Sequence, residues 1–191
     1  MANAEDGKRS YHHGDLRAAL IEAGLRLLAE RSADAIGLRE AARAVGVSAT
    51  AVYRHFPDKG AFLAALAAEG LRQLGAAQRA AAEAAGGGDR GFAATGAAYV
   101  RFAVANPALF RLAFSASGAG PKWAPGDWHA ENDAARLLRE NAERLSAGEA
   151  AARRTALRAW GLVHGLALLI LDGQVVIEDA EIDAVVGGYS P

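Results

Sequence analysis

The segment from Gly37 to Lys59 restricts the fold more than any other part of the chain. Its pattern predicts a short helix over residues 38–45, a tight turn at Gly46-Val47-Ser48 and a second short helix over residues 49–55. Glycine suits the left-handed end of a helix, and serine caps the start of the next one. Pro57 then ends the second helix, because proline lacks an amide donor. Two short helices joined this way form a helix-turn-helix, a motif that can lay its second helix in the major groove of DNA.

The rest of the chain also predicts helices. Alanine is abundant, and apolar residues recur at spacings of three and four, which is the helical period. No segment shows the alternation that is typical of a strand, so we expect an all-α fold of about nine helices. The expected helix starts are marked by Asp15, by Asn106 before Pro107, by Asp127, and by a capping box of Ser146 and Glu149.

The expected helices group into two domains. Residues 15–60 form an N-terminal three-helix domain that contains the helix-turn-helix, and residues 61–191 form a larger helical domain. Residues 1–14 are polar and hold Lys8-Arg9 and His12-His13, so we expect a flexible basic arm. The arm could enter a minor groove, or it could be a merely disordered tail. Nothing near its histidines supplies further ligands, so no metal site is expected there.

Composition excludes several chemistries. The chain has no cysteine, which rules out disulfides, zinc–cysteine clusters and thiol nucleophiles. It also lacks a glycine-rich phosphate loop and a metal-spaced cluster of His, Asp and Glu. His164 and Asp172 are too far apart along one helix to form a catalytic dyad. We therefore expect neither an enzyme nor a cofactor. The net charge of −1 means that any DNA contact must rest on the local placement of cations.

Hydropathy argues against a membrane protein. The longest apolar run, residues 159–171, is thirteen residues long and is interrupted by His164. A spanning helix needs about 20 residues. The N-terminal residues also lack the basic and then apolar layout of a signal peptide. We expect a soluble, cytoplasmic protein with no membrane partner.

The second short helix carries the residue types that DNA recognition needs. Small residues at its start, from Ala49 to Ala51, would let the helix approach base edges. Hydroxyl, imidazole and ammonium donors at Tyr53, His55 and Lys59 could contact phosphates. Tyr53 could instead belong to the core, but Val52 and Phe56 are the better core candidates.

Residues Ala44 to Lys59 resemble the signature of the TetR (tetracycline-repressor-like) family. The resemblance extends back through the first helix and forward into the fourth. It implies a homodimer that binds a palindromic double-stranded DNA operator, most simply a repressor that an unknown small-molecule effector releases. Activation in place of repression stays open. The residues that carry the match are Gly46, Val47, Ser48, Tyr53, His55, Phe56 and Lys59.

The resemblance also implies roles for single residues. It assigns phosphate contacts to Tyr53, His55 and Lys59, and it places Arg39 where a side chain can reach a base edge or a phosphate. Because only Arg39 could make a bidentate contact with guanine, part of the specificity should come from groove shape and half-site spacing. Gly37 stands where the family often has Thr or Ser, so a phosphate-binding hydroxyl is missing. The expected DNA-binding set is Arg39, Ser48, Ala49, Thr50, Ala51, Tyr53, His55 and Lys59.

Aromatic residues concentrate after residue 90. Most should be core, but some could line an effector cavity between helices. Residues 159–165, followed by Asp172-Gly173, resemble the C-terminal region of a TetR subgroup marked by a Trp and a His-Gly pair. Within it His164 could contact a ligand or could be a buried, hydrogen-bonded histidine. The candidate pocket residues are Phe92, Tyr99, Phe102, Phe110, Phe114, Trp128, Trp160 and His164.

The eighth helix and the last helix form the expected dimer surface, packed as a four-helix bundle with the partner. Gly161 and Gly165 give a smooth strip that fits a helix–helix contact as well as a pocket floor. The alternative to a DNA-binding regulator is a helical protein that binds a ligand but not DNA. The expected dimer strip is Trp160, Val163, Ala167 and Ile170.

Overall fold

A computed structural model describes residues 16–115 and 132–187 of the chain. Within these two ranges the fold is all-α, as expected, with nine α-helices, one 3-10 turn and no strand. The elements are α1 (Leu16–Glu30), η1 (Ala33–Ala35), α2 (Leu38–Val45), α3 (Ala49–Tyr53), α4 (Lys59–Ala84), α5 (Gly88–Ala105), α6 (Pro107–Phe114), α7 (Asp133–Arg144), α8 (Glu149–Leu171) and α9 (Asp179–Gly187).

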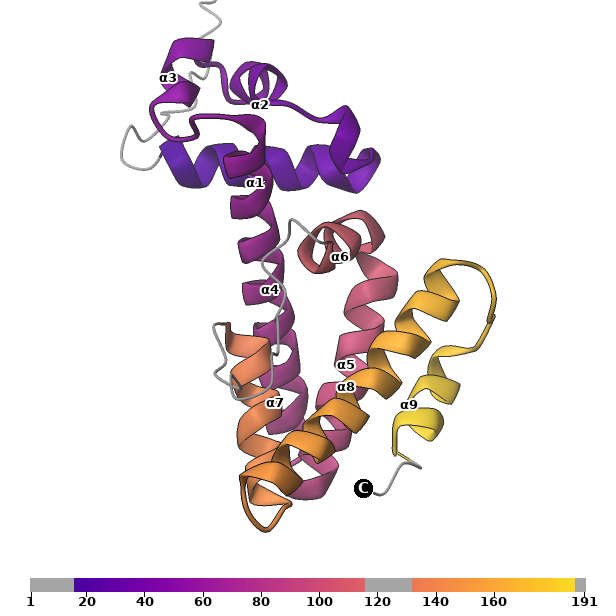
Figure 1. The fold of residues 1–191 in the computed structure, drawn as a ribbon. Coiled ribbons are helices and arrows are strands. Elements are labelled where there is room, and N and C mark those ends of the chain that lie inside the picture. The colour runs from indigo at the N-terminus through magenta and orange to yellow at the C-terminus, as the bar shows by residue number, and fades with distance from the viewer. Residues whose placement is uncertain (1–15, 116–131, 188–191) are drawn as a thin grey trace, which may run out of the picture.

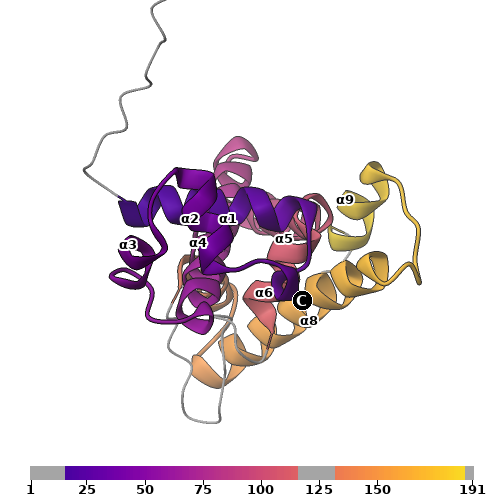
Figure 2. The ribbon, with the colours of Figure 1, turned by 90° about the horizontal axis from the view of Figure 1, so that it is seen from above.

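The helices form two groups that α4 connects. Helices α1, α2 and α3 lie together at one end of the molecule, and α4 runs from this group into the group formed by α5 to α9 (Figure 1). Seen along the other direction, α8 and α9 lie to the side of the α1–α3 group (Figure 2). The candidate DNA-binding residues therefore lie in one group, and the aromatic residues of α5, α6 and α8 lie in the other.

The helix-turn-helix prediction is confirmed, apart from the length of its second helix. Helix α2 spans the expected residues and ends at Gly46, whose φ of +78° is left-handed. The Ser48 hydroxyl caps α3 by accepting a hydrogen bond from the amide of Ala51 at 3.3 Å. Helix α3 ends at Tyr53, two residues earlier than expected, and α4 starts after Asp58, whose carboxylate caps it. The local signals of glycine, serine and proline thus set this turn.

Two expected side-chain caps do not form, although α6 begins at the expected residue and α8 begins close to its expected start. The Ser146 hydroxyl bonds to that of Thr155, and α8 starts after Gly148 without a side-chain cap, so no capping box forms. The side chain of Asn106 donates to the carbonyl of Phe102, which ends α5, and does not cap α6. Asn132 caps α7 by accepting from the amide of Ala135. The expected cap Asp127 and the arm of residues 1–14 lie outside the described residues.

The first core lies where α4 enters the helix-turn-helix. Phe62 of α4 is fully buried and contacts Phe56 edge to face, with ring centroids 5.2 Å apart. Val52 and Phe56 are buried as the sequence predicted. The guanidinium of Arg17 covers the Phe56 ring at 5.3 Å. This apolar cluster also includes Leu20, Leu28, Ile36, Leu38 and Leu66.

The second core fills the space between α4, α5, α6 and α8, and α6 belongs to both cores. Leu109 and Leu112 of α6 pack in the first core, whereas Phe110 and Ala113 pack in the second. The division at residue 60 stays a prediction, but it does not separate the packing, since both α4 and α6 contribute to each core.

Part of the apolar strip of α8 that was expected to bind a partner subunit faces inward. Val163 is 8% exposed and Ala167 is fully buried, and both pack in the second core together with the partly buried Trp160 and Ile170. Val163 and Ala167 of the expected dimer strip therefore pack in the chain's own core, whereas the place of Trp160 and Ile170 in a dimer surface stays a prediction. In the described part of the chain, α8 is the one helix long and apolar enough to cross a membrane by length and composition.

Candidate DNA-binding surface and ligand cavity

Helix α3 presents small residues at its start and buries its far side. Ala49 and Thr50 are exposed and Ala51 is half-buried, whereas Val52 is fully buried against the first core. The cap formed by Ser48 holds this first turn in place. With only small side chains outward, the helix backbone could approach base edges closely.

Donor groups surround that exposed turn. Tyr53 is 49% exposed because Val52 and Phe56 take the core positions beside it. His55, in the turn that follows, is exposed, as is Arg39 in the first turn of α2. These three side chains are free of the protein interior and can reach a molecule outside it.

Lys59 is held differently from the other donors. It begins α4, is half-buried, and its Nζ donates to the carbonyl of Asp34 in η1 at 2.7 Å. An ammonium group has three N–H donors, so this bond fixes its position and leaves two donors. Lys59 therefore links η1 to α4 and still carries a positive charge at the edge of the helix-turn-helix.

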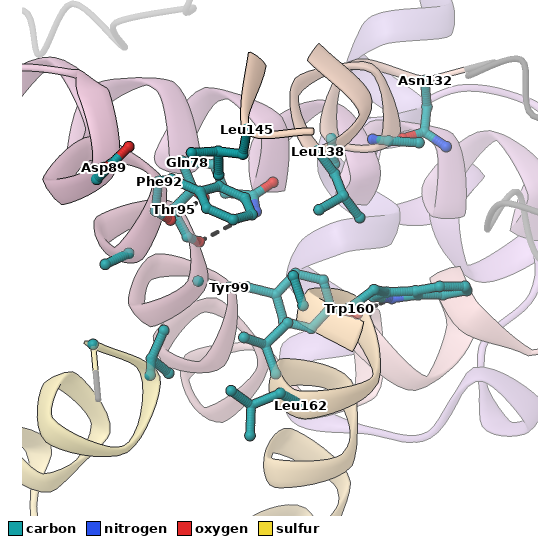
Figure 3. Close-up of a pocket in the computed structure, with 18 of the residues that line it drawn as sticks. Gln78, Asp89, Phe92, Thr95, Tyr99, Asn132, Leu138, Leu145, Trp160 and Leu162 are labelled. Carbon is teal, nitrogen blue, oxygen red and sulfur yellow. Dashed lines mark hydrogen bonds between the residues drawn. The ribbon is translucent and has the colours of Figure 1, made fainter. Parts of the chain in front are cut away.

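A cavity of about 390 Å³ lies in the larger helical group. Side chains of α4, α5, α7 and α8 line it, with contributions from α6 and α9 (Figure 3). This volume lies within the usual range for small-molecule sites, about 300–1,000 Å³. Four of the candidate pocket aromatics lie in its wall: Phe92, Tyr99, Phe114 and Trp160.

The remaining candidate pocket residues lie elsewhere. Phe110 is fully buried in the second core, and Phe102 packs between the two cores, so neither lines the cavity. His164 is behind the wall, where it hydrogen-bonds Tyr99. Trp128 lies outside the described residues. Counting aromatics found the right region but could not separate wall from core.

Tyr99 and Trp160 of the cavity wall form a hydrogen-bonded chain with His164, which lies behind the wall. The indole N–H of Trp160 donates to the Tyr99 hydroxyl at 3.3 Å, and that hydroxyl lies 2.7 Å from Nδ1 of His164. Because an indole only donates, the tyrosine hydrogen is left for His164. Burial raises the pKa of Tyr99 and lowers the pKa of His164. His164 is thus a neutral, hydrogen-bonded histidine, the second of the two roles considered from the sequence.

Stability should fall in mild acid because of His164. Its pKa is lowered in the folded state, so the unfolded chain takes up a proton first as the pH falls through the ordinary histidine range. The stability that neutral His164 contributes to the fold is fully present above that pH range and is lost below it. We expect His164→Gln to reduce the loss of thermal stability between pH 7.5 and pH 5.5, measured by circular dichroism. The exposed His55→Gln is the matched control. Equal pH dependence in all three proteins would contradict this account.

Two polar residues of the cavity were missed in the sequence. Gln78 is 7% exposed on α4, and Asn132 begins α7; both line the cavity (Figure 3). A signal for Gln78 was present. It follows Leu71, Leu74 and Gly75 at helical spacing and so lies on the buried face of α4.

The fold and its exposed recognition helix define the class of helix-turn-helix transcriptional regulators. Residues 20–66 match the sequence model of the bacterial regulatory proteins of the tetR family. Residues 92–186 match the model of the tetracyclin repressor-like C-terminal domain. The chain belongs to the TetR family, which confirms the resemblance seen around Ala44–Lys59.

Solved structures of similar shape agree with this family. A protein of unknown function from Rhodococcus sp. RHA1 is 32% identical, with 95% of this chain and 96% of that chain covered and a TM-score of 0.73. A TetR-family transcriptional regulator from Streptomyces coelicolor is 20% identical, with coverages of 89% and 76% and a TM-score of 0.63. A TetR family transcription regulator from Marinobacter aquaeolei VT8 is 20% identical, with coverages of 89% and 91% and a TM-score of 0.53. The last two share the fold alone. No curated protein sequence matches the chain.

Proposed function

We propose that this TetR-family regulator is a cytoplasmic repressor that binds a palindromic operator as a homodimer and leaves it when a small molecule occupies the cavity. The observation that carries the proposal is the exposed first turn of α3, with Ala49 and Thr50 outward and Tyr53 and His55 free beside it. Within residues 16–115 and 132–187, the side chains of Thr50, Tyr53 and His55 form no hydrogen bond. A surface of small residues flanked by hydrogen-bond donors suits a DNA groove.

In this proposal the contacts divide into two kinds. Ala49, Thr50 and Ala51 meet base edges, and Arg39 reaches a base edge or a phosphate. Tyr53, His55 and Lys59 bind the phosphates. Ser48 caps the recognition helix and so fixes its first turn. One copy reads few base pairs, so specificity requires two copies on half-sites about 34–36 Å apart.

The outward face of α8 is the better candidate for the dimer surface. Leu157 and Leu169 are 37% and 40% exposed on this face, and Val185 of α9 is 43% exposed. A side chain at Gly161 or Gly165 would meet no atom of the same chain within 4 Å. Leu157, Gly161, Gly165 and Leu169 follow one another at four-residue spacing along one side of α8, on which a second α8 can pack closely.

Replacing Gly161 by arginine tests this dimer surface. In one chain the new side chain meets open space, and arginine favours a helix more than glycine does, so the fold should persist. In a dimer the side chain would stand in the interface. We expect Gly161→Arg to shift sedimentation from dimer to monomer, whereas the exposed Ala68→Arg on α4 should remain dimeric. A dimeric Gly161→Arg protein would place the interface elsewhere.

The cavity and the helix-turn-helix are connected by α6 as well as by α4. Phe114 at the end of α6 lines the cavity, and Leu109 and Leu112 of the same helix pack in the first core. A ligand that displaces Phe114 can therefore move α6 and α4 and change the spacing of the two recognition helices. Linkage requires the effector to favour the state that does not bind DNA, with a typical coupling of about 1–3 kcal/mol.

A gel-shift titration with the promoter region of the chain's own gene tests the proposal. We expect a shift that weakens with salt and depends on a palindrome. If the protein shifts no duplex DNA even at low salt, the alternative holds, namely a helical protein that binds a ligand but not DNA. A complex that forms only with the effector would indicate activation or co-repression in place of release.

A further inference from the structure

Within the described residues, the buried side-chain amide of Gln78 has a hydrogen bond at its nitrogen but none at its oxygen. The side chain of Gln78 lines the cavity and is 7% exposed. Its Nε2 donates to the carbonyl oxygen of Thr95 at 3.2 Å, which Figure 3 marks as a dashed line. Its Oε1 is buried without a hydrogen-bond partner in the described part of the chain. An unpaired buried acceptor costs free energy, and a ligand that donates to it would recover that cost.

The orientation of this amide is fixed by chemistry. Rotating the amide by half a turn would place Oε1 against the Thr95 carbonyl oxygen, and two acceptors cannot bond. The Thr95 hydroxyl does not compete, because it donates to the carbonyl of Phe92 at 2.6 Å. Oε1 of Gln78 is therefore an acceptor available to a molecule in the cavity.

Asn132 offers the complementary group. Its Oδ1 accepts from the amide of Ala135 at 2.9 Å, so this amide is also fixed in orientation. Its Nδ2 is buried and has no partner within residues 16–115 and 132–187. In the view of Figure 3, Gln78 and Asn132 lie on either side of Leu138, and Tyr99 and Trp160 lie across from Leu138. The cavity thus combines one acceptor, one donor and aromatic walls.

The described part of the cavity wall offers no free counter-charge for an ionised ligand. No Lys, Arg or His side chain lines the described part of the cavity. Its one carboxylate, Asp89, is 81% exposed and is paired with Arg144 at 3.0 Å. The hydroxyl of Tyr99 stays protonated, because burial raises its pKa. A buried anion or cation would lose its hydration here without gaining a counter-charge, which is costly.

We propose that the cavity binds a neutral, largely aromatic molecule whose hydroxyl or amide N–H donates to Oε1 of Gln78 and whose acceptor meets Nδ2 of Asn132. Aromatic alcohols and lactams fit this description, and their carboxylate counterparts do not. The inference rests on the proposed function in one respect, namely that the cavity takes an effector. It adds the chemical class of that effector and the two residues that select it.

Calorimetric titration of the full-length protein at pH 7 tests this selectivity. The probes are 2-naphthol and 4-phenylphenol, their methyl ethers, and the carboxylates with the same rings. We expect each alcohol to bind about fivefold to tenfold more tightly than its ether, which is the usual net worth of one hydrogen bond. The carboxylates should bind most weakly. This ranking is measured on the wild-type protein and so does not depend on any variant folding.

Two variants test whether Gln78 causes this ranking of ligand affinities. Gln78→Met keeps a similar volume but removes the acceptor, so alcohol and ether should bind within about twofold of each other. Gln73→Met is the matched control on the same helix, because Gln73 bonds Glu69 and does not line the cavity. It should keep the wild-type preference.

Three outcomes would overturn the proposal: alcohols that bind no better than ethers or carboxylates, a preference that survives Gln78→Met, or no binding of either alcohol. DNA binding is measured separately, on protein without ligand. Its failure would refute the proposed function and would leave the ligand ranking standing.

Discussion

Replacing Tyr53 by phenylalanine together with Lys59 by alanine should weaken operator binding by roughly 100-fold or more, because a neutral and a charged hydrogen bond are lost in each protomer. The Tyr53 hydroxyl is exposed and the Lys59 ammonium keeps two donors beyond its bond to Asp34. Phosphate contacts carry no sequence information, so all operators should weaken alike. Fluorescence anisotropy across a salt series is the measurement, and losing one cation per protomer should lower the salt slope by about 2.

Two controls make this result specific. Arg154→Ala removes an exposed cation of α8, a helix of the other helical group, and should leave binding unchanged. Arg39→Ala should weaken binding and also relax the preference at one base pair. Because Lys59→Ala also removes the bond to Asp34, unfolding temperatures and the single variant Tyr53→Phe separate binding from stability. If the double variant binds with unchanged affinity and salt slope, Tyr53 and Lys59 do not face DNA.

The helix-turn-helix could be predicted because its signals are local. A left-handed glycine at Gly46, a capping serine at Ser48 and a proline at Pro57 act within a few residues of their own position. The burial of Val52 could be predicted for the same reason, since a short helix has only one buried side, and Phe56 follows Val52 four residues later. Tertiary packing did not have to be known.

Packing decided the features that the sequence mispredicted. Gly148, with a left-handed φ of +85°, is the last residue before α8 and takes the cap position that was expected for Ser146. The Ser146 hydroxyl bonds instead to the hydroxyl of Thr155 within α8. The apolar strip of α8 was recognised correctly as a strip. Periodicity locates such a face but does not say whether it packs on the same chain or on a partner, and here Val163 and Ala167 of the strip pack in the chain's own core.

The cavity shows the same limit of prediction from sequence. Aromatic residues mark the region, yet Phe110 fills the core while Phe114, one turn later, lines the wall. The selectivity that we propose for the cavity rests on Oε1 of Gln78, which has no hydrogen-bond partner among the described residues. The sequence indicates that Gln78 lies on the buried face of α4. It does not indicate the hydrogen bonds of Gln78, because these depend on α5.

Removing the Phe62 side chain should have the largest effect on stability. Phe62 is fully buried where α4 enters the first core, and a Cβ placed on Gly24 of α1 would lie 2.6 Å from its ring. The ring therefore lies directly against the backbone of α1 and, on its other side, contacts Phe56. We expect Phe62→Ala to lower the free energy of unfolding by about 3–5 kcal/mol, since such a cavity collapses poorly. Urea unfolding followed by circular dichroism, at one protein concentration, measures the loss.

Phe92→Ala is the matched comparison for this prediction. Phe92 is half-buried and lines an existing cavity, so truncating it loses fewer contacts and should cost less than half as much. Phe62 also joins α4 to the helix-turn-helix, so Phe62→Ala should lower operator affinity even at temperatures where the protein is still folded. Equal stability losses for the two variants would mean that α4 is not held by the first core. The route from the cavity through α4 to the recognition helices would then have to run through α6 alone, by way of Leu109 and Leu112.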